Sequence, residues 1–447
     1  MARIAIIGTG IAGLAAAHRL HAAGRRDLTL YEAGDHVGGH TATVDVTVAG
    51  RRYAIDTGFI VFNEHTYPRF CALLRELGVA SKPTTMSFGV RDDATGLEYG
   101  TNTLADLFAQ PRNLASPRHW RMIAEIVRFN RVARELLATD DDTTTLDAYL
   151  TRRRFSATFR DRFIVPMGAA IWSAPPGELG RFPARYFVEF FANHRFLDLT
   201  RRPVWRVIVG GSREYVRPLI RPFADRIRLR TPVDQLRRRG DVVEIVAAGV
   251  TERYDHVVVA CHTDQAMRLL ADPTPAERAV VGAIRYQPND VVLHTDTSLL
   301  PRARRAWSAW NYHLGPDPSR PATLTYDMNL LQGLDAPVRF CVTLNEPEAI
   351  DPATILGRYT YDHPVYTAAT RAAQRRWHEV SGPGSRTQFA GACWFYGFHE
   401  DGVRSGQRAA DAIIAATTTA TTAATTTAAA TAPAAGVGAT VGPEVPA

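Results

Sequence analysis

The sequence predicts an α/β protein with a Rossmann-like domain and a second domain of the α+β class. Three observations predict it. A glycine-rich turn lies between a strand and a helix near the N-terminus. The run Val257–Ala260 is apolar at every position, as in a central parallel strand covered on both faces. Residues 286–345 alternate between apolar and polar positions, which favours antiparallel strands. The 447 residues are enough for about two or three domains.

The predicted elements follow the chain in a simple order. Residues 3–32 predict a strand, a turn, a helix through His21 and a second strand, and residues 100–165 have helical spacing. Strands return from about residue 204, and the last ordered unit is a strand near Phe389 and a helix over Val403–Ala415. Residues 417–447 contain only Ala, Thr, Gly, Pro, Val and one charge, Glu444, so they predict a disordered tail.

The first turn has the pattern Gly8-x-Gly10-x-x-Gly13, and the acid Glu32 ends the next strand. Gly8 permits a tight turn, Gly10 lets a pyrophosphate approach the backbone, and Gly13 lets helix and strand pack closely. The helix N-terminus attracts phosphates, and Glu32 can accept hydrogen bonds from ribose hydroxyls. Because the flanking strand and helix are also present, the pattern predicts dinucleotide binding.

Composition excludes several other chemistries. The chain has 51 arginines and one lysine, Lys82, so it has no P-loop and one candidate for Schiff-base chemistry. Its four cysteines are far apart and form no C-x-x-C, which indicates a reducing compartment and no metal site. No basic run resembles a nucleic-acid-binding module, so we expect no nucleic-acid partner.

The expected location is the cytoplasm. No apolar run reaches the ~18 residues that would cross a bilayer. The stretch Ile4–Ala17 is apolar like a signal peptide, but it contains three glycines and no cleavage site, so it is interpreted as strand, turn and helix. A basic segment over residues 152–163, with Phe155, Phe159 and Phe163 at helical spacing, suggests either a solvated helix face or peripheral contact with the inner membrane face.

Two later motifs carry a family resemblance. Glu32-Ala33 followed by Gly38-Gly39 and Thr41 resembles the flavin amine oxidase and phytoene-desaturase-like FAD-dependent oxidoreductases. More narrowly, Ile55–Tyr67 and Tyr396–Gly406 resemble a bacterial subgroup of predicted NAD/FAD-binding proteins that often accompany cyclopropane-fatty-acid-synthase-like proteins. The resemblance implies non-covalent FAD, an amine-oxidase-like fold with an FAD-binding domain and a substrate domain, and a fatty-acid methyltransferase as a candidate partner.

The resemblance also implies which residues contact FAD, from its pyrophosphate and adenosine to its isoalloxazine. These are Gly8, Gly10, Ile11, Ala12, Gly13, Glu32, Gly38, Gly39, His40, Thr41, Gly58, Phe59, Ile60, Val233, Gly402 and Val403. A helix starting near Gly402 would point its positive end at the flavin N1/O2 region.

Two positions depart from the family pattern. His40 replaces the usual arginine, so a group expected to titrate near neutrality would hydrogen-bond the cofactor there. Ala392 stands where the family often has an acid, which either Glu400 or Asp401 could replace. Cys393 is a conceivable covalent flavin anchor that nothing in its spacing supports.

The predicted FAD domain comprises residues 1–95, 200–285 and 375–415, and the substrate domain residues 96–199 and 286–374. Aromatic residues at 394–399 could cover the flavin or pack in the core, and those at 186–196 could line a tunnel, although core packing is favoured.

The family's amine oxidases hold a water near flavin N5 with a lysine, and no lysine follows Lys82. We therefore expect an FAD-dependent oxidoreductase that removes hydride from an apolar substrate such as a lipid acyl chain, with His399 as the candidate catalytic residue. The alternatives are a flavin amine oxidase acting on a small amine, and a non-catalytic flavin- or lipid-binding partner of the methyltransferase. NAD in place of FAD is a further alternative.

Overall fold

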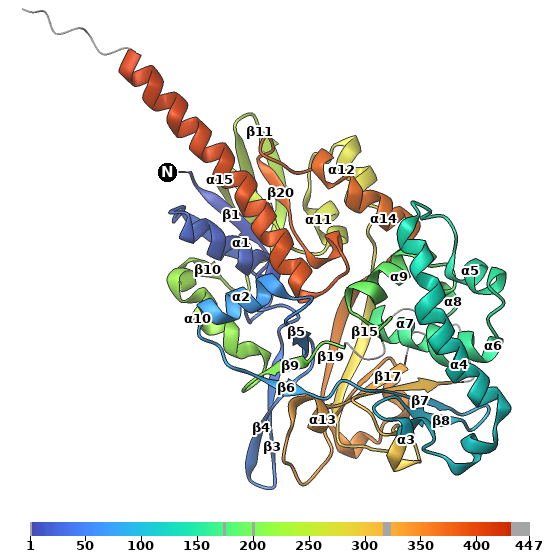
Figure 1. Cartoon of the computed structure of the whole chain (residues 1–447). Helices are drawn as coiled ribbons and strands as arrows, with labels where there is room; N and C mark the ends of the chain where they lie inside the picture. Colours follow the sequence, from blue (N-terminus) through green and yellow to red (C-terminus); the bar gives the residue numbers. More distant parts are fainter. Residues whose placement is uncertain (1, 173–175, 199–201, 316–322, 431–447) are drawn as a thin grey trace, which may run out of the picture.

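The computed structural model describes residues 2–172, 176–198, 202–315 and 323–430 (Figure 1). Its two largest sheets have five and seven strands. The five-stranded sheet is parallel throughout, with the order β10-β2-β1-β14-β20. Its strands are β1 (Ile4–Ile7), β2 (Leu28–Tyr31), β10 (Ile227–Arg228), β14 (His256–Val259) and β20 (Thr387–Phe389). The predicted central parallel strand is confirmed, because β14 pairs with β1 on one side and with β20 on the other.

Both faces of this sheet are covered, which explains why its central strands are apolar at every position. Helices α1 (Ile11–Ala22) and α15 (His399–Ala430) pack on the face presented by Ile4, Ile6 and Val258. A three-stranded sheet packs on the opposite face, formed by β11 (Val233–Arg239), β12 (Val242–Ala247) and β13 (Val250–Tyr254). This arrangement is the Rossmann-like part of the predicted α/β fold.

Two glycines let α1 approach its neighbours closely. A Cβ at Gly13 would lie 2.0 Å from the Gly8 carbonyl oxygen, and one at Gly406 would lie 2.1 Å from the Ala12 carbonyl oxygen. Neither backbone atom can move without disrupting the turn or the helix. The close packing role predicted for Gly13 is therefore present in the structure.

The seven-stranded sheet has the order β19-β15-β18-β17-β16-β7-β8 and is antiparallel except between β7 and β16. Residues 286–345 supply β15 to β18, so the predicted antiparallel strands are confirmed. β7 lies within the predicted first-domain segment 1–95, yet its backbone hydrogen bonds join the second sheet. The strands are β7 (Phe88–Asp92), β8 (Glu98–Gly100), β15 (Tyr286–His294), β16 (Trp310–Leu314), β17 (Thr323–Asp327), β18 (Cys341–Leu344) and β19 (Ile355–Pro364).

A helical layer lies beside this sheet (Figure 1) and encloses the largest apolar core. Its helices are α3 (Leu104–Leu107), α4 (Pro117–Val132), α5 (Leu146–Arg152), α6 (Ala157–Phe159), α7 (Val165–Trp172), α8 (Pro176–Leu179) and α9 (Ala184–Asn193), with a π-helical turn at Arg160–Ile164 and 3₁₀ turns at Pro111–Ala115 and Ala133–Ala138. The predicted helical region over 100–165 is therefore present, although it is divided into short helices.

Smaller elements connect the two sheets. They are the hairpin β3 (Thr43–Val48) and β4 (Arg51–Asp56), the three-stranded sheet of β5 (Phe62–Asn63), β9 (Trp205–Ile208) and β6 (Ser81–Thr84), and the helices α2 (Pro68–Glu76), α10 (Val216–Ile220), α11 (Thr263–Leu269), α12 (Pro275–Val280), α13 (Met328–Gln332) and α14 (Ala368–Arg375). The remaining 3₁₀ turns are Ser212–Tyr215, Arg221–Arg226, Arg304–Ala306, Pro347–Ala349, Pro352–Thr354, Trp377–Glu379 and Ala392–Trp394.

The basic segment over residues 152–163 does not present an apolar face to solvent. Phe159 and Phe163 are buried, and Phe155 packs against the same core. Ring centroids are 4.8 Å apart for Phe155 and Phe159, and 5.8 Å apart for Phe159 and Phe163. Because these rings already pack inside the protein, this segment fits the solvated helix face and not the membrane contact considered from sequence.

The last helix differs from the prediction at both ends. α15 begins at His399 instead of near Gly402, and it continues to Ala430 instead of ending at Ala415. Residues 417–430, predicted to be disordered, continue this helix, because extending an existing helix needs no new nucleus. Arg25 also donates from Nε to Thr417 Oγ1 at 2.9 Å. Residues 431–447 of the predicted tail lie outside the described residues. No helix in the described part of the chain has the length and hydropathy needed to cross a bilayer.

Candidate active site

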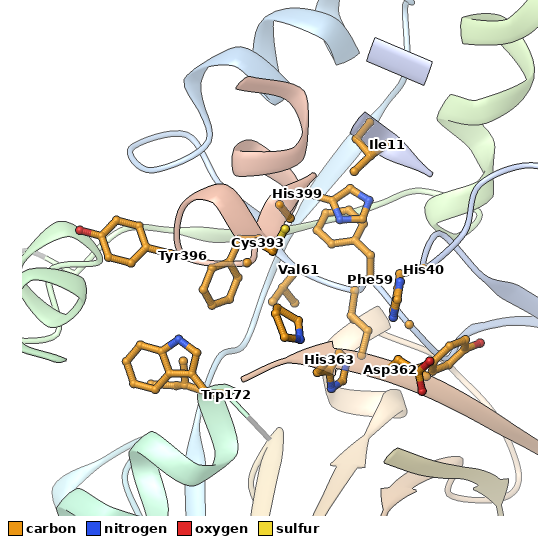
Figure 2. A pocket seen from close by; sticks show the side chains of 18 of the residues that line it. Ile11, His40, Phe59, Val61, Trp172, Asp362, His363, Cys393, Tyr396 and His399 are labelled. Carbon is orange, nitrogen blue, oxygen red and sulfur yellow. The ribbon is translucent and has the colours of Figure 1, made fainter. Parts of the chain in front are cut away.

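A large cavity lies between the parallel sheet, the seven-stranded sheet and the helical layer. Its volume is about 1310 Å³. This exceeds the roughly 300–1,000 Å³ of most small-molecule pockets, so the cavity can hold more than one ligand of ordinary size. Figure 2 shows part of its wall, with His40, Asp362 and His363 gathered on one side and Trp172 and Tyr396 on the other.

Most of the residues predicted to contact the cofactor line this cavity. They are Gly8, Gly10, Ile11, Ala12, Glu32, Gly38, Gly39, His40, Gly58, Phe59, Ile60 and Val233. Gly13, Thr41, Gly402 and Val403 do not line it. Gly13 packs against Gly8, and a Cβ at Gly402 would lie 2.6 Å from the Ile11 Cγ2 atom. Val403 is fully buried in the core beneath the parallel sheet. These residues support the wall from behind.

The N-terminus of α1 faces the cavity, and its backbone N–H groups have no side-chain cap. Gly10 is the N-cap residue, no side chain caps the helix, and its first turn contains no acid. A Cβ at Gly10 would meet no atom within 4 Å. The first backbone N–H groups of a helix have no intrahelical partner, and they carry partial positive charge. This turn therefore fits a pyrophosphate.

Glu32 is held at the carboxyl end of β2 by three backbone and hydroxyl donors. Its Oε2 atom accepts from Thr9 N at 3.0 Å and from Thr9 Oγ1 at 2.5 Å. Its Oε1 atom accepts from Gly34 N at 2.8 Å. A carboxylate has about four lone-pair sites, so one remains for a ribose hydroxyl. The carboxylate is thus oriented in advance at the cavity wall.

The imidazole of His40 has a nitrogen in this wall that points to a missing ligand. Its Nε2 atom is buried without a hydrogen-bond partner among the described residues. The rings of Tyr361 and His363 lie 5.3 Å and 5.6 Å away between centroids. Burial, together with the neighbouring His363 and His262, lowers the pKa of His40 to about 3. The expected titration near neutrality is therefore wrong for this environment, and His40 offers a neutral imidazole to a cofactor.

The backbone of His40 also fixes the next predicted segment. Phe59 N donates to the His40 carbonyl oxygen at 2.8 Å. A Cβ at Gly58 would lie 2.2 Å from that same oxygen. Glycine is required at position 58 because the two segments pass each other at backbone distance. This contact brings Phe59 and Ile60 to the cavity.

His399, the candidate catalytic residue, lines the cavity at the start of α15 and is almost fully buried. Its Nε2 atom lies 3.1 Å from Thr41 Oγ1 and 3.2 Å from Tyr215 OH, which are themselves 2.5 Å apart. Burial lowers the pKa of His399 well below its ordinary value. The ring is therefore neutral and is held by two hydroxyl groups; its catalytic role stays a prediction.

Neither acid considered as a replacement at position 392 lines the cavity. Glu400 accepts hydrogen bonds from Arg69 N at 3.0 Å and Phe70 N at 2.9 Å, and so caps the N-terminus of α2. Asp401 accepts from Phe398 N at 2.9 Å. Burial raises the pKa of both carboxyl groups, that of Asp401 to about 7. Both acids accept hydrogen bonds from backbone N–H groups at helix N-termini, and neither reaches the cavity.

The aromatic run before α15 divides between cavity and core. Tyr396, Phe398 and His399 line the cavity, while Trp394 is buried in the core against β14 and β20. Cys393 also lines the cavity, and burial raises the pKa of its thiol to about 11. Because the thiolate is the reactive form, this cysteine is a poor nucleophile in this environment.

Sequence reasoning missed the wall formed by β19. Tyr361, Asp362 and His363 line the cavity, and His363 Nδ1 lies 3.0 Å from Asn289 Nδ2. Tyr361 OH lies 2.8 Å from Thr57 Oγ1, beside the glycine at 58. The alternation of Tyr359, Tyr361 and His363 at every second position was the available signal for a strand with one chemically distinct face.

One end of the cavity, which we call the apolar arm, is walled by α4, the π-helical turn, α7, α9 and the turn after α9. Most of its side chains are aliphatic or aromatic: Ile123, Ile126, Val127, Phe163, Met167, Ile171, Trp172, Phe190, Phe191 and Phe196. Asn130 and His194 also line it, and His194 Nδ1 lies 3.1 Å from the Phe190 carbonyl oxygen. Part of the aromatic segment 186–196 therefore lines the cavity, while Tyr186 and Phe187 pack in the core.

A family model for flavin containing amine oxidoreductases matches residues 11–317 of the chain. The chain belongs to this family. The protein is an FAD-dependent oxidoreductase, and the amine-oxidase-like fold predicted from sequence is confirmed.

Individual relatives are more distant. Tryptophan 2-monooxygenase from Pantoea agglomerans pv. gypsophilae is 32% identical over 128 residues, which are 28% of this chain and 18% of that protein. A putrescine oxidase structure with bound putrescine has a TM-score of 0.68 at 17% identity, covering 93% of this chain and 99% of that one. The CLA-producing fatty acid isomerase from P. acnes has a TM-score of 0.65 at 18% identity, covering 91% and 97%. At such identities these structures show the fold alone.

The residues of the cavity fit FAD. The open α1 N-terminus would hold the pyrophosphate, Glu32 the adenosine ribose, and the buried His40 Nε2 atom a polar atom farther along the cofactor. FAD, when bound, supplies a hydride acceptor. The chain's own contribution is to orient these groups in advance and to keep water away through its aromatic walls.

Proposed function

We propose that this FAD-dependent oxidoreductase removes hydride from a long apolar substrate, with a lipid acyl chain as the substrate class. The observation that carries the proposal is the apolar arm. Its ten aliphatic and aromatic side chains come from α4, the π-helical turn, α7, α9 and the turn after α9, and they line the same cavity as Phe59 and His399. Such a wall favours an alkyl chain, because each buried methylene contributes about 0.8 kcal/mol.

The polar groups of the cavity also favour an apolar substrate over an amine. Among the described lining residues the acids are Glu32 and Asp362, and neither belongs to the arm. Glu32 is occupied by Thr9 and Gly34, and Asp362 lies on β19 near His262. Lys82, the single lysine, lies on β6 with its Nζ atom 3.5 Å from the Gly333 carbonyl oxygen, away from the cavity wall. An ammonium substrate in the arm would thus lack a carboxylate partner.

In the proposed reaction a substrate C–H bond gives hydride to the cofactor, and a base or solvent takes one proton. Molecular oxygen or an electron carrier then receives the two electrons. The resemblance to proteins that accompany fatty-acid methyltransferases supports a lipid substrate, and partnership with such a methyltransferase is part of this proposal.

The test is anaerobic mixing of the FAD-loaded protein with three substrate groups: unsaturated phospholipids, methyl-branched phospholipids, and small amines such as putrescine and cyclohexylamine. We expect lipids to bleach the flavin and amines to leave it oxidised. Bleaching by amines alone would overturn the proposal in favour of an amine oxidase. Bleaching by neither group would favour a flavin- or lipid-binding partner without turnover.

A substitution in the apolar arm tests whether the substrate chain lies there during the reaction. Met167→Trp fills part of the arm, so we expect bleaching by a long-chain lipid to slow by about tenfold or more. Met267→Trp is the matched control, because Met267 is partly buried and lies outside the cavity wall. Equal rates for the two variants would show that the chain does not occupy the arm.

A further inference from the structure

The outer surface of α3, the following turn and α4 combines exposed apolar side chains with arginines. Leu104 is 79% exposed, Trp120 50% and Val127 48%. Leu114 is exposed between them. With Arg121, Arg128 and Arg131, these residues form what we call the α3–α4 surface. It lies on the side of the molecule opposite the C-terminal end of α15 (Figure 1).

Helical geometry places the apolar and basic side chains together. Trp120 and Val127 are seven residues apart on α4, and Arg131 is eleven residues beyond Trp120, so all three lie on one side of the helix. Arg128 and Arg121 flank this side. Tryptophan and valine beside arginines are the composition of helices that lie in the interface of a membrane.

Arginines outnumber acids on this surface, whose acids are Asp106 on α3 and Glu125 on α4. Glu125 is the one acid of α4, and it is buried, where it accepts from Ser156 N at 3.1 Å and from Arg121 Nε at 3.3 Å. Arg131 has no acidic partner within the described ranges. The surface therefore carries net positive charge.

The apolar arm opens at this same surface. Leu104 and Val127 line the cavity and are also exposed, so they mark its opening. A second cavity, of about 550 Å³, shares Val127 and Asn130 with the first. Three arginines line the second cavity, Arg128, Arg131 and Arg134. An apolar passage thus ends beside a basic groove.

We propose that the α3–α4 surface binds an anionic lipid bilayer, with Trp120, Leu104 and Val127 entering the interface and the arginines facing the headgroups. The occupant is a lipid surface because exposed apolar and basic side chains are combined around an opening that leads to the apolar arm. Docking by itself does not require the proposed reaction. Entry of a lipid into the apolar arm, between Leu104 and Val127, does rest on the proposed reaction.

The experiment measures cosedimentation of the FAD-loaded full chain with vesicles of phosphatidylcholine, alone or mixed with phosphatidylglycerol. We expect the anionic lipid to raise binding by about tenfold or more. The double variant Arg128→Glu/Arg131→Glu should lose most of this gain, and Leu104→Ser/Trp120→Ser should weaken binding to both kinds of vesicle. Flavin absorbance of each variant reports whether the fold is retained.

The control variant Val250→Ser/Arg278→Glu combines one apolar-to-serine change with one arginine-to-glutamate change, at an exposed valine and an exposed arginine far from α4. It should bind vesicles like the wild type. Failure of the wild type to bind either vesicle, or equal losses in the control and the α3–α4 variants, would overturn the docking. Binding to anionic vesicles by a protein whose flavin no lipid reduces would support the docking while contradicting the proposed function.

Discussion

The imidazole of His399 stacks on the ring of Phe59, with centroids 3.5 Å apart and ring planes inclined by 12° (Figure 2). The two residues are 340 positions apart in the chain, and their contact joins the start of α15 to the segment that follows Gly58. Phe70 packs edge-on against both rings. The stack therefore connects the two ends of the predicted FAD-binding region through one aromatic cluster.

This environment predicts that His399 does not titrate during catalysis. Because burial lowers the pKa of His399 well below its ordinary value of about 6.5, the ring is neutral between about pH 6.5 and about pH 8. We expect His399→Gln to keep the shape of the kcat/KM profile over that range, whatever its effect on the rate. Loss of one limb of the profile in the variant would identify His399 as a titrating acid or base.

Two glycines of the first turn should respond differently to alanine. Gly10→Ala places its Cβ in open space toward the cavity, so we expect a folded protein whose FAD affinity falls by about tenfold or more. Gly13→Ala places its Cβ 2.0 Å from the Gly8 carbonyl oxygen, so we expect a lower free energy of unfolding even without cofactor.

Flavin titration and denaturant unfolding of the apoprotein measure these two effects. Gly384→Ala is the control, because its Cβ would also meet no atom within 4 Å and it lies outside the cavity wall. Equal FAD affinity for Gly10→Ala and Gly384→Ala would contradict the pyrophosphate assignment.

The unpartnered Nε2 atom of His40 predicts a cofactor contact. We expect His40→Phe to preserve the aromatic packing with Tyr361 and His363 while weakening FAD binding, at a cost of about 1–3 kcal/mol for the lost polar contact. His40→Arg, which restores the usual family residue, should bind FAD more tightly than His40→Phe. Flavin titration of the two variants measures the difference, and indistinguishable affinities would contradict the contact.

We expect the buried carboxyl group of Asp401 to make the free energy of unfolding depend on pH. Burial raises the pKa of its carboxyl group to about 7, above its unfolded value, so the folded protein holds the proton more tightly. The associated stability is present at acidic pH and is lost as pH rises toward the folded pKa. From about pH 5 to about pH 7, we expect the free energy of unfolding to fall by up to ~3 kcal/mol more in the wild type than in Asp401→Asn.

Urea unfolding of both proteins at a series of pH values measures this difference. Asparagine can still accept the hydrogen bond from Phe398 N, so the helix end is preserved. Parallel pH dependences for the two proteins would show that Asp401 ionises normally.

The local sequence was sufficient to predict features that depend on the residues of one short segment. The backbone approach at Gly10, the close packing at Gly13 and the fully apolar strand β14 could each be predicted, because steric and burial constraints act within a few residues. The sequence alone also restricted the chemistry of the cavity, since its single lysine is at position 82.

The tertiary structure decided which distant residues meet. Tyr361 and His363 reach His40 only because β19 pairs with β15, and the proximity of His363 lowers the pKa of His40 along with burial. Phe155, Phe159 and Phe163 have the spacing of a surface helix, yet the surrounding helices enclose them. Residue spacing fixes which side chains share one face of one element. The packing of elements far apart in the chain determines whether that face meets a cofactor, the protein core or solvent.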